Sequence, residues 1–114
     1  MRVTQSQVHT VPVLHVTGDV DHAAAPVLEE SVDAALAEGD SCILFDLEAC
    51  PYLDSGGVSV LLHTLKRVKP GGWLGVVDPT PDVLRILSLV GFGMDPNFRV
   101  FAGLDEARAA VSPT

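Results

Sequence analysis

The stretch 42–69 constrains the fold more than any other part of the chain. It contains a short apolar run, Ile43–Leu47, that is rich in strand-forming residues. An Asp-Ser-Gly-Gly turn at 54–57 then leads directly into a helix whose apolar residues recur at spacings of three and four. An apolar run of this kind is typical of a central strand that is buried on both faces. The stretch therefore predicts a helix packed against a largely parallel sheet.

Strands and helices alternate along the rest of the chain as well. The predicted strands are 3–9, 12–17, 43–47, 73–77 and 98–101. The predicted helices are 24–38, the one that runs from Ser55 to Val68, the one between Thr80 and Gly91, and 104–111. Such alternation indicates an α/β fold whose first two strands are antiparallel. We expect a single domain over residues 1–114, with a mixed, mostly parallel sheet of about five strands and about four helices.

Charge and hydropathy exclude two classes of partner. The chain has 7 basic and 15 acidic residues, a formal net charge of −8, which argues against a nucleic-acid binder. The basic residues Lys66, Arg67 and Lys69 end a predicted helix, where cations complement the helix dipole. No apolar run is long enough to span a bilayer, and residues 1–7 contain no signal-peptide core. We therefore expect a cytoplasmic protein without membrane insertion.

The potential metal ligands are dispersed. Cys42 and Cys50 form no Cys-x-x-Cys motif and are predicted to be small buried residues, and the four histidines are scattered. Asp19, Asp21 and Asp54 could gather at strand ends to hold Mg²⁺, although roles in turns and helix caps explain them better. We expect neither a metal nor a cofactor.

Ser55 is the one reactive side chain in a defined setting, because it stands between a predicted strand and a predicted helix. A hydrolase elbow wants glycine two residues before the serine, where this chain has Leu53, and His63 lies about two helical turns farther on. The Gly56-Gly57 pair lacks the Lys-Ser/Thr that completes a phosphate-binding P-loop. A small serine hydrolase remains open as a third hypothesis.

The same serine is also suited to be a cap or a modification site. Either Asp54 or Ser55 can cap the helix. Gly56 and Gly57 weaken its first turn by up to about 1 kcal/mol each, so a purely structural start would not need both. We interpret them as leaving Ser55 open to a partner's active site.

At this point the sequence resembles a known family. The segment FDLEACPYLDSGGVSVLL, residues 45–62, resembles the signature of STAS domains, specifically the bacterial anti-sigma factor antagonists. The turn Gly18-Asp19-Val20-Asp21 is similar to the family's Gly-Glu-[Leu/Ile]-Asp turn after the second strand. Segments 83–92 and 100–107 resemble its late helix and its closing segment, so the likeness covers nearly the whole chain.

The resemblance implies a STAS-like fold and a regulatory binding protein rather than an enzyme. Such antagonists bind an anti-sigma factor, itself a serine kinase, and thereby release a sigma factor. Phosphorylation of the serine directly after the aspartate breaks the complex, and a serine phosphatase restores it. Carried over by motif position, the phosphorylated residue is Ser55, and the surface around it includes Asp21, Asp54, Gly56 and Gly57.

The chain departs from the family pattern at two positions. Gly56 stands where the family usually has Ser or Thr, and Ser59 stands where a further glycine is common. A second hypothesis keeps the fold without the switch, because stand-alone STAS domains also occur as small subunits of transport or stress-sensing complexes. The two hypotheses differ in the partner: an ATP-binding anti-sigma kinase, or a transporter or sensor subunit.

Overall fold

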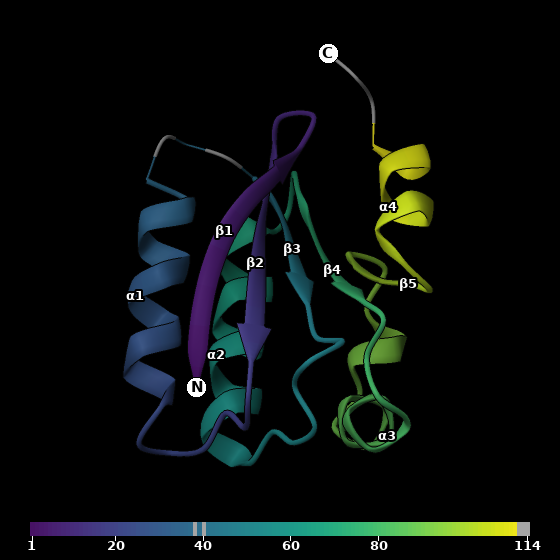
Figure 1. Cartoon of the computed structure of the whole chain (residues 1–114). Coiled ribbons are helices and arrows are strands. Elements are labelled where there is room, and N and C mark those ends of the chain that lie inside the picture. The colour runs from purple at the N-terminus through teal and green to yellow at the C-terminus, as the bar shows by residue number, and fades with distance from the viewer. Residues whose placement is uncertain (38, 40, 112–114) are drawn as a thin grey trace.

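Five strands form one mixed sheet in the computed structural model, which describes residues 1–37, 39 and 41–111 (Figure 1). The strands lie in the sheet in their order along the chain; the first pair is antiparallel and the other three pairs are parallel. Their bounds are β1 Arg2–Val8, β2 Val11–Thr17, β3 Cys42–Asp46, β4 Trp73–Val77 and β5 Phe98–Phe101. The predicted antiparallel start followed by a parallel sheet is confirmed.

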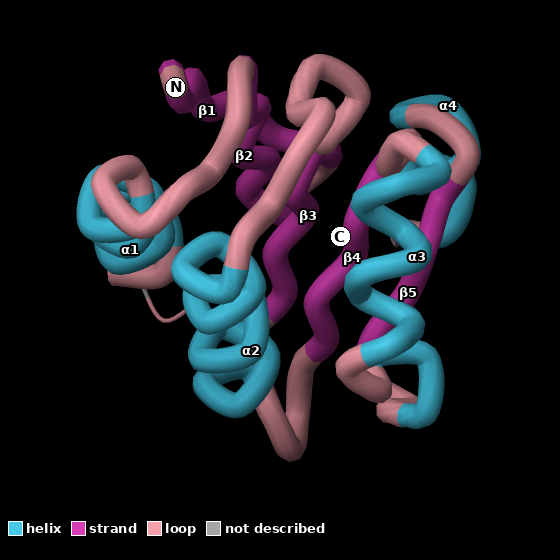
Figure 2. Tube along the Cα trace, turned by 90° about the horizontal axis from the view of Figure 1, so that it is seen from below, coloured by secondary structure: helices cyan, strands magenta, loops and turns pink. Residues whose placement is uncertain are grey.

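The described residues form four α-helices, which cover the two faces of the sheet unequally. Figure 2 shows α1 and α2 side by side under one face, with α4 at the far end of the other face. The helices are α1 Ala25–Ala35, α2 Ser55–Val68, α3 Pro81–Leu89 and α4 Leu104–Ala110, and a short 3₁₀ helix, η1, spans Phe92–Met94. None of the helices in the described part of the chain has the length and apolar character needed to cross a membrane.

The alternation of side chains along β3 builds a core on each face of the sheet. Ile43 and Phe45 pack into the large apolar cluster that α1, α2 and α3 cover, whereas Leu44 packs into a smaller cluster under α4. All three side chains are fully buried. Each contributes roughly 1.5–3 kcal/mol of transfer free energy, so the predicted central strand carries a large share of the stability.

The ends of two helices differ from the prediction. Helix α1 ends at Ala35 rather than Glu38: Leu36 N still donates to Val32 O at 2.9 Å, but Ala37 N donates to Ala34 O at 3.4 Å, only three residues back, which closes the helix with a tighter turn. Glu38 itself lies outside the described residues. Helix α4 ends at Ala110, one residue earlier than predicted.

The two cysteines also differ from each other. Cys50 is buried, as predicted, but Cys42 at the start of β3 is only partly buried. The prediction of two buried cysteines is therefore half correct.

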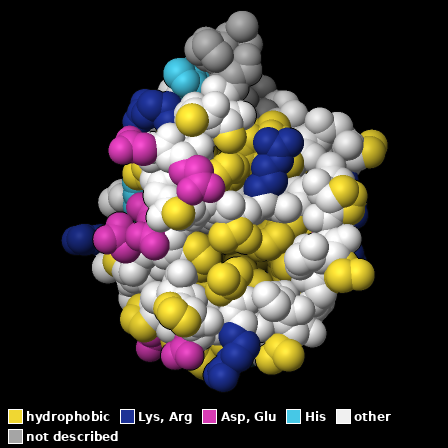
Figure 3. All heavy atoms as spheres, turned by 90° about the vertical axis from the view of Figure 1, so that its right-hand side faces the viewer, with side chains coloured by type: hydrophobic (Ala, Val, Ile, Leu, Met, Phe, Trp, Pro, Cys, Tyr) yellow, Lys and Arg dark blue, Asp and Glu magenta, His cyan; other side chains and the backbone are white. Residues whose placement is uncertain are grey.

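Apolar side chains are exposed at the β5 end of the sheet. Figure 3 shows this side of the molecule, with yellow apolar atoms gathered between basic side chains. The exposed large apolar residues of α3, η1, β5 and the turn between the first two are Leu84, Leu89, Val90, Met94 and Val100. The first of these elements, α3, begins at Pro81, well after the Asp-Ser-Gly-Gly turn at 54–57, so this surface is separate from the turn in the chain.

In the connection from α2 to β4, the structure requires glycine at position 72 but not at the adjacent position 71. A Cβ on Gly72 would lie 1.5 Å from the backbone oxygen of Ser41, whereas a Cβ on Gly71 would meet nothing within 4 Å. We predict that Gly72→Ala lowers the free energy of unfolding by more than about 3 kcal/mol, while Gly71→Ala changes it by less than about 0.5 kcal/mol. Urea denaturation of both variants measures the difference, and equal stabilities would contradict this close approach.

Candidate functional site

Two loops meet at one end of the sheet and are tied together through their backbones. The loop after β2 donates from Gly18 N to Ala49 O at 2.9 Å and from Val20 N to Tyr52 O at 3.0 Å. Asp54 N donates back to Val20 O at 3.1 Å, which makes an isolated parallel bridge between Val20 and Leu53. The start of α2 is thereby held against the loop that follows β2.

Asp54 is the N-cap of α2. Its Oδ1 accepts hydrogen bonds from Gly56 N at 2.7 Å and Gly57 N at 3.3 Å. Its Oδ2 accepts from His22 N at 3.0 Å, across a separation of 32 residues. The sequence left Asp54 and Ser55 open as the cap, and the structure assigns that role to Asp54 because its backbone is extended while Ser55 is already helical.

Ser55 is the first residue of α2, and its side chain is exposed. The amides that would receive an anion at the start of this helix, those of Gly56 and Gly57, already bind the Asp54 carboxylate. These two amides are therefore not free to accommodate a phosphate on Ser55. A phosphate there would meet a carboxylate before it met free amides.

Gly56 and Gly57 are buried, which changes the interpretation of this glycine pair. A Cβ on Gly56 would lie 2.9 Å from His22 Nδ1, and a Cβ on Gly57 would lie 3.0 Å from Val20 O. The glycines thus allow the helix to approach the loop after β2 closely. This packing accounts for both residues without an open surface around the serine, and their contact with a partner stays a prediction.

Asp21 lies on the same pair of loops. Its Oδ1 accepts a hydrogen bond from Ala24 N at 2.8 Å and so starts the turn into α1. The residue that follows it, His22, donates its backbone N–H to Asp54. Because Asp21 is exposed and adjacent to His22, its carboxylate adds negative charge to the surface that presents Ser55.

An open hollow of about 300 Å³ lies beside the serine turn, between the first turns of α1 and α2. Pro26 and Glu29 line it from α1, and Gly56, Ser59 and His63 line it from α2. Sequence reasoning missed this hollow, because nothing in the chain before folding indicates that α1 and α2 lie side by side. A partner that covers Ser55 could insert a side chain here.

Neither a metal site at this turn nor a reactive cysteine beside it finds support in the described residues. Two of the three aspartates proposed for Mg²⁺, Asp21 and Asp54, accept hydrogen bonds from backbone amides. Within the described residues no three or more His, Cys, Asp or Glu side chains are grouped to hold a metal ion. Burial raises the pKa of the Cys50 thiol, as expected of a packed core residue rather than a nucleophile.

Comparison with known proteins gives consistent results. The model of the STAS domain matches residues 2–107. The anti-sigma-F factor antagonist RsfB of Mycobacterium tuberculosis is 30% identical over 109 residues, which are 96% of this chain and 88% of that protein. The crystal structure of an anti-sigma factor antagonist from Mycobacterium paratuberculosis has a TM-score of 0.83 and 30% identity, and covers 96% of this chain and 92% of its own.

A third similarity concerns the fold alone. The Bacillus cell fate determinant SpoIIAA, solved in its phosphorylated form, has a TM-score of 0.77 and 22% identity. The alignment covers 97% of this chain and 100% of that one. The arrangement of strands and helices described above is therefore the arrangement found in that protein.

The capping role of Asp54 can be separated from any role of Ser55 by two substitutions. We predict that Asp54→Ala lowers the free energy of unfolding by about 1–2 kcal/mol, because three backbone amides lose their acceptor. Ser55→Ala should change it by less than about 0.5 kcal/mol, since the exposed hydroxyl caps nothing. Urea denaturation of the two variants measures this, and a larger loss for Ser55→Ala would make the serine the cap instead.

Proposed function

Because this chain belongs to the STAS domain family, we propose that it acts as an anti-sigma factor antagonist in the cytoplasm: it binds an anti-sigma factor and releases a sigma factor. The observation that carries the proposal is an exposed serine on a surface made by two loops that are hydrogen-bonded to each other, in a chain similar along almost its whole length to named antagonists. The function is one of binding, and Ser55 is a modified residue rather than a catalytic one.

The proposed switch is phosphorylation of Ser55 by the anti-sigma factor itself, acting as a serine kinase, and removal of the phosphate by a serine phosphatase. A phosphate adds about −1.5 to −2 charges at neutral pH. It would stand next to the Asp54 carboxylate, whose oxygens already take the amides of Gly56, Gly57 and His22. These three amides are therefore not free to compensate the new charge.

Electrostatics then acts on the complex more than on the fold. A partner that covers Ser55 would have to bury a phosphate beside Asp54 and near Asp21, and burying an unpaired charge costs several kcal/mol. Moving a complex from almost fully bound to almost fully free needs roughly 5.5 kcal/mol, so one phosphate is of the right magnitude. In the free protein the phosphate stays in water, where it costs little.

The fold itself is compatible with such a modification. SpoIIAA, which shares the fold, has been solved in a phosphorylated form. In this chain the bridge between Val20 and Leu53 and the cap at Asp54 do not involve the Ser55 side chain. A change at Ser55 therefore leaves the loop surface in place and alters only its charge.

The proposal predicts a selective loss of one partner. We expect wild-type protein and Ser55→Ala to capture an ATP-binding anti-sigma factor from lysate of the native host, and Ser55→Asp to capture at least about tenfold less. Ser88→Asp is the matched control, because Ser88 is also an exposed helical serine but lies on α3, outside the two loops and the hollow beside Ser55. Quantitative mass spectrometry of the captured proteins measures the ratio.

Two outcomes of this capture would contradict the switch. Equal recovery of a transporter or sensor subunit on all four baits would favour the non-switching STAS subunit. Equal loss on Ser55→Asp and Ser88→Asp would point to general repulsion by added charge rather than to a site at Ser55.

Phosphorylation has its own test. We predict that the captured anti-sigma factor, supplied with Mg²⁺ and ATP, adds one phosphate to wild-type protein and none to Ser55→Ala. Intact mass and peptide mapping read the result. A wild-type protein that stays unmodified while a control antagonist is labelled would sink the phosphorylation step and leave the binding proposal standing.

A further inference from the structure

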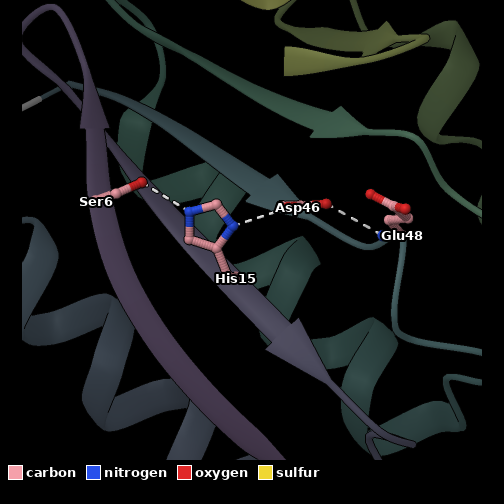
Figure 4. A network of polar contacts seen from close by, with 4 residues as sticks. All are labelled: Ser6, His15, Asp46 and Glu48. Atoms are coloured by element: carbon pink, nitrogen blue, oxygen red, sulfur yellow. Dashed lines mark hydrogen bonds and ion pairs between the residues drawn. The ribbon is translucent and has the colours of Figure 1, made fainter.

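Three polar side chains form a chain of short hydrogen bonds across the sheet, and none of them belongs to the serine turn. Ser6 Oγ lies 2.7 Å from His15 Nε2, and His15 Nδ1 lies 2.7 Å from Asp46 Oδ2 (Figure 4). Ser6 comes from β1, His15 from β2 and Asp46 from β3. The function proposed above uses none of these residues.

Strand register brings the three residues together. Asp46 pairs directly with His15 in the parallel ladder between β2 and β3. In the antiparallel ladder His15 pairs with Thr4, and Ser6 lies two residues farther along β1 on the same face. A diagonal neighbour of this kind is within reach of a side chain as long as histidine.

The order of atoms is that of a nucleophile, a base and an orienting carboxylate. A carboxylate accepts a hydrogen bond, so the Nδ1 atom of His15 carries the proton that it donates to Asp46. The Nε2 atom then has its lone pair free to accept the hydroxyl proton of Ser6. Asp46 is itself held, because its Oδ1 accepts a hydrogen bond from Glu48 N at 3.2 Å (Figure 4).

The serine end of this network is accessible. The Ser6 residue is exposed, while the side chains of His15 and Asp46 are 28% and 15% exposed. In Figure 1 no helix lies in front of β1 and β2 on this face. Helix α4 covers the β4–β5 half of the same face, where Ala107 packs with Val77 and Phe101. The nucleophile therefore faces solvent, and its base is partly shielded.

Negative charge around the network limits which reactants can approach Ser6. A hollow of about 280 Å³ adjoins Asp46 and is lined by three further carboxylates, those of Glu48, Asp78 and Asp105. The whole chain carries a formal net charge of −8. Uncharged or cationic reactants are favoured over anionic ones at such a surface.

We infer that Ser6 is an activated serine that accepts an acyl group from a small, uncharged or cationic activated ester. Ser6 Oγ attacks the carbonyl carbon of the ester while its proton passes to His15 Nε2. The bond from the carbonyl carbon to the leaving oxygen then breaks, and the alcohol departs with that proton. The products are acyl-Ser6 and one alcohol, and the reaction needs neither oxidant nor reductant.

The test compares serines within one molecule. The purified protein is incubated with 4-nitrophenyl acetate, and acetylation is followed residue by residue through peptide mass spectrometry. Positioned general bases accelerate proton transfer steps by roughly 10²–10⁴-fold, so we expect Ser6 to be acetylated at least about tenfold faster than the exposed Ser55. Equal rates at the two serines in the wild-type protein would overturn the inference without any variant.

Substitutions then assign the roles. His15→Gln should reduce the Ser6 rate to that of Ser55. Asp46 is a positioning residue, so Asp46→Asn should slow Ser6 and also shift the ¹⁵N resonances of the His15 ring away from the tautomer protonated at Nδ1. An unchanged Ser6 rate in a folded His15→Gln protein, as judged by circular dichroism, would make the network a purely structural cross-strand contact. The proposed antagonist function is independent of these outcomes, because it depends on Ser55.

Discussion

The geometry of the serine turn depends on the hydrogen bonds that the Asp54 carboxylate accepts. This carboxylate joins the first turn of α2 to the loop after β2 by binding the amides of Gly56, Gly57 and His22. Hydrogen bonds to a charged acceptor are stronger than neutral ones, so a single side chain fixes two loops that are far apart in the sequence. The same bonds remove the amides that could otherwise bind a second anion. Asp54 thus fixes the position of Ser55 at the start of α2 and leaves added negative charge there poorly compensated.

The apolar residues that stabilise the sheet are distinct from the polar residues of the two proposed sites. Its β3 strand is buried on both faces, and the large cluster under α1, α2 and α3 provides most of the core. Ser55 lies where β3 has ended and α2 begins, which is where α/β folds commonly place their binding residues. The opposite face is covered by α4 only in part, so that Ser6 and His15 stay near solvent. Two polar regions therefore sit on one scaffold without sharing a residue.

Much of the fold could be predicted from the sequence, because its signals are local. The spacing of apolar residues in α2 and the start of a helix after Thr80 both appear in the structure, where Val83 N donates to Thr80 Oγ1 at 3.3 Å. Side-chain type alone could not decide between Asp54 and Ser55 as the cap of α2, because both residue types cap helices.

Contacts between distant segments were not predictable in this way. The sequence shows that Gly56 and Gly57 lack side chains, but not that Val20 and His22 fill the space. The interpretation that these glycines leave the serine open to a partner stays a prediction, although Ser55 itself is exposed. The bonds among Ser6, His15 and Asp46 depend on the register of three strands, which periodicity does not reveal. The backbone ties between the two loops have an evolutionary consequence: because main-chain atoms make these bonds, an exposed side chain on the loops such as that of Tyr52 can be exchanged at little cost to folding. After duplication, copies of such a domain can therefore acquire different binding partners, so that each copy in one cell avoids the partners of the others.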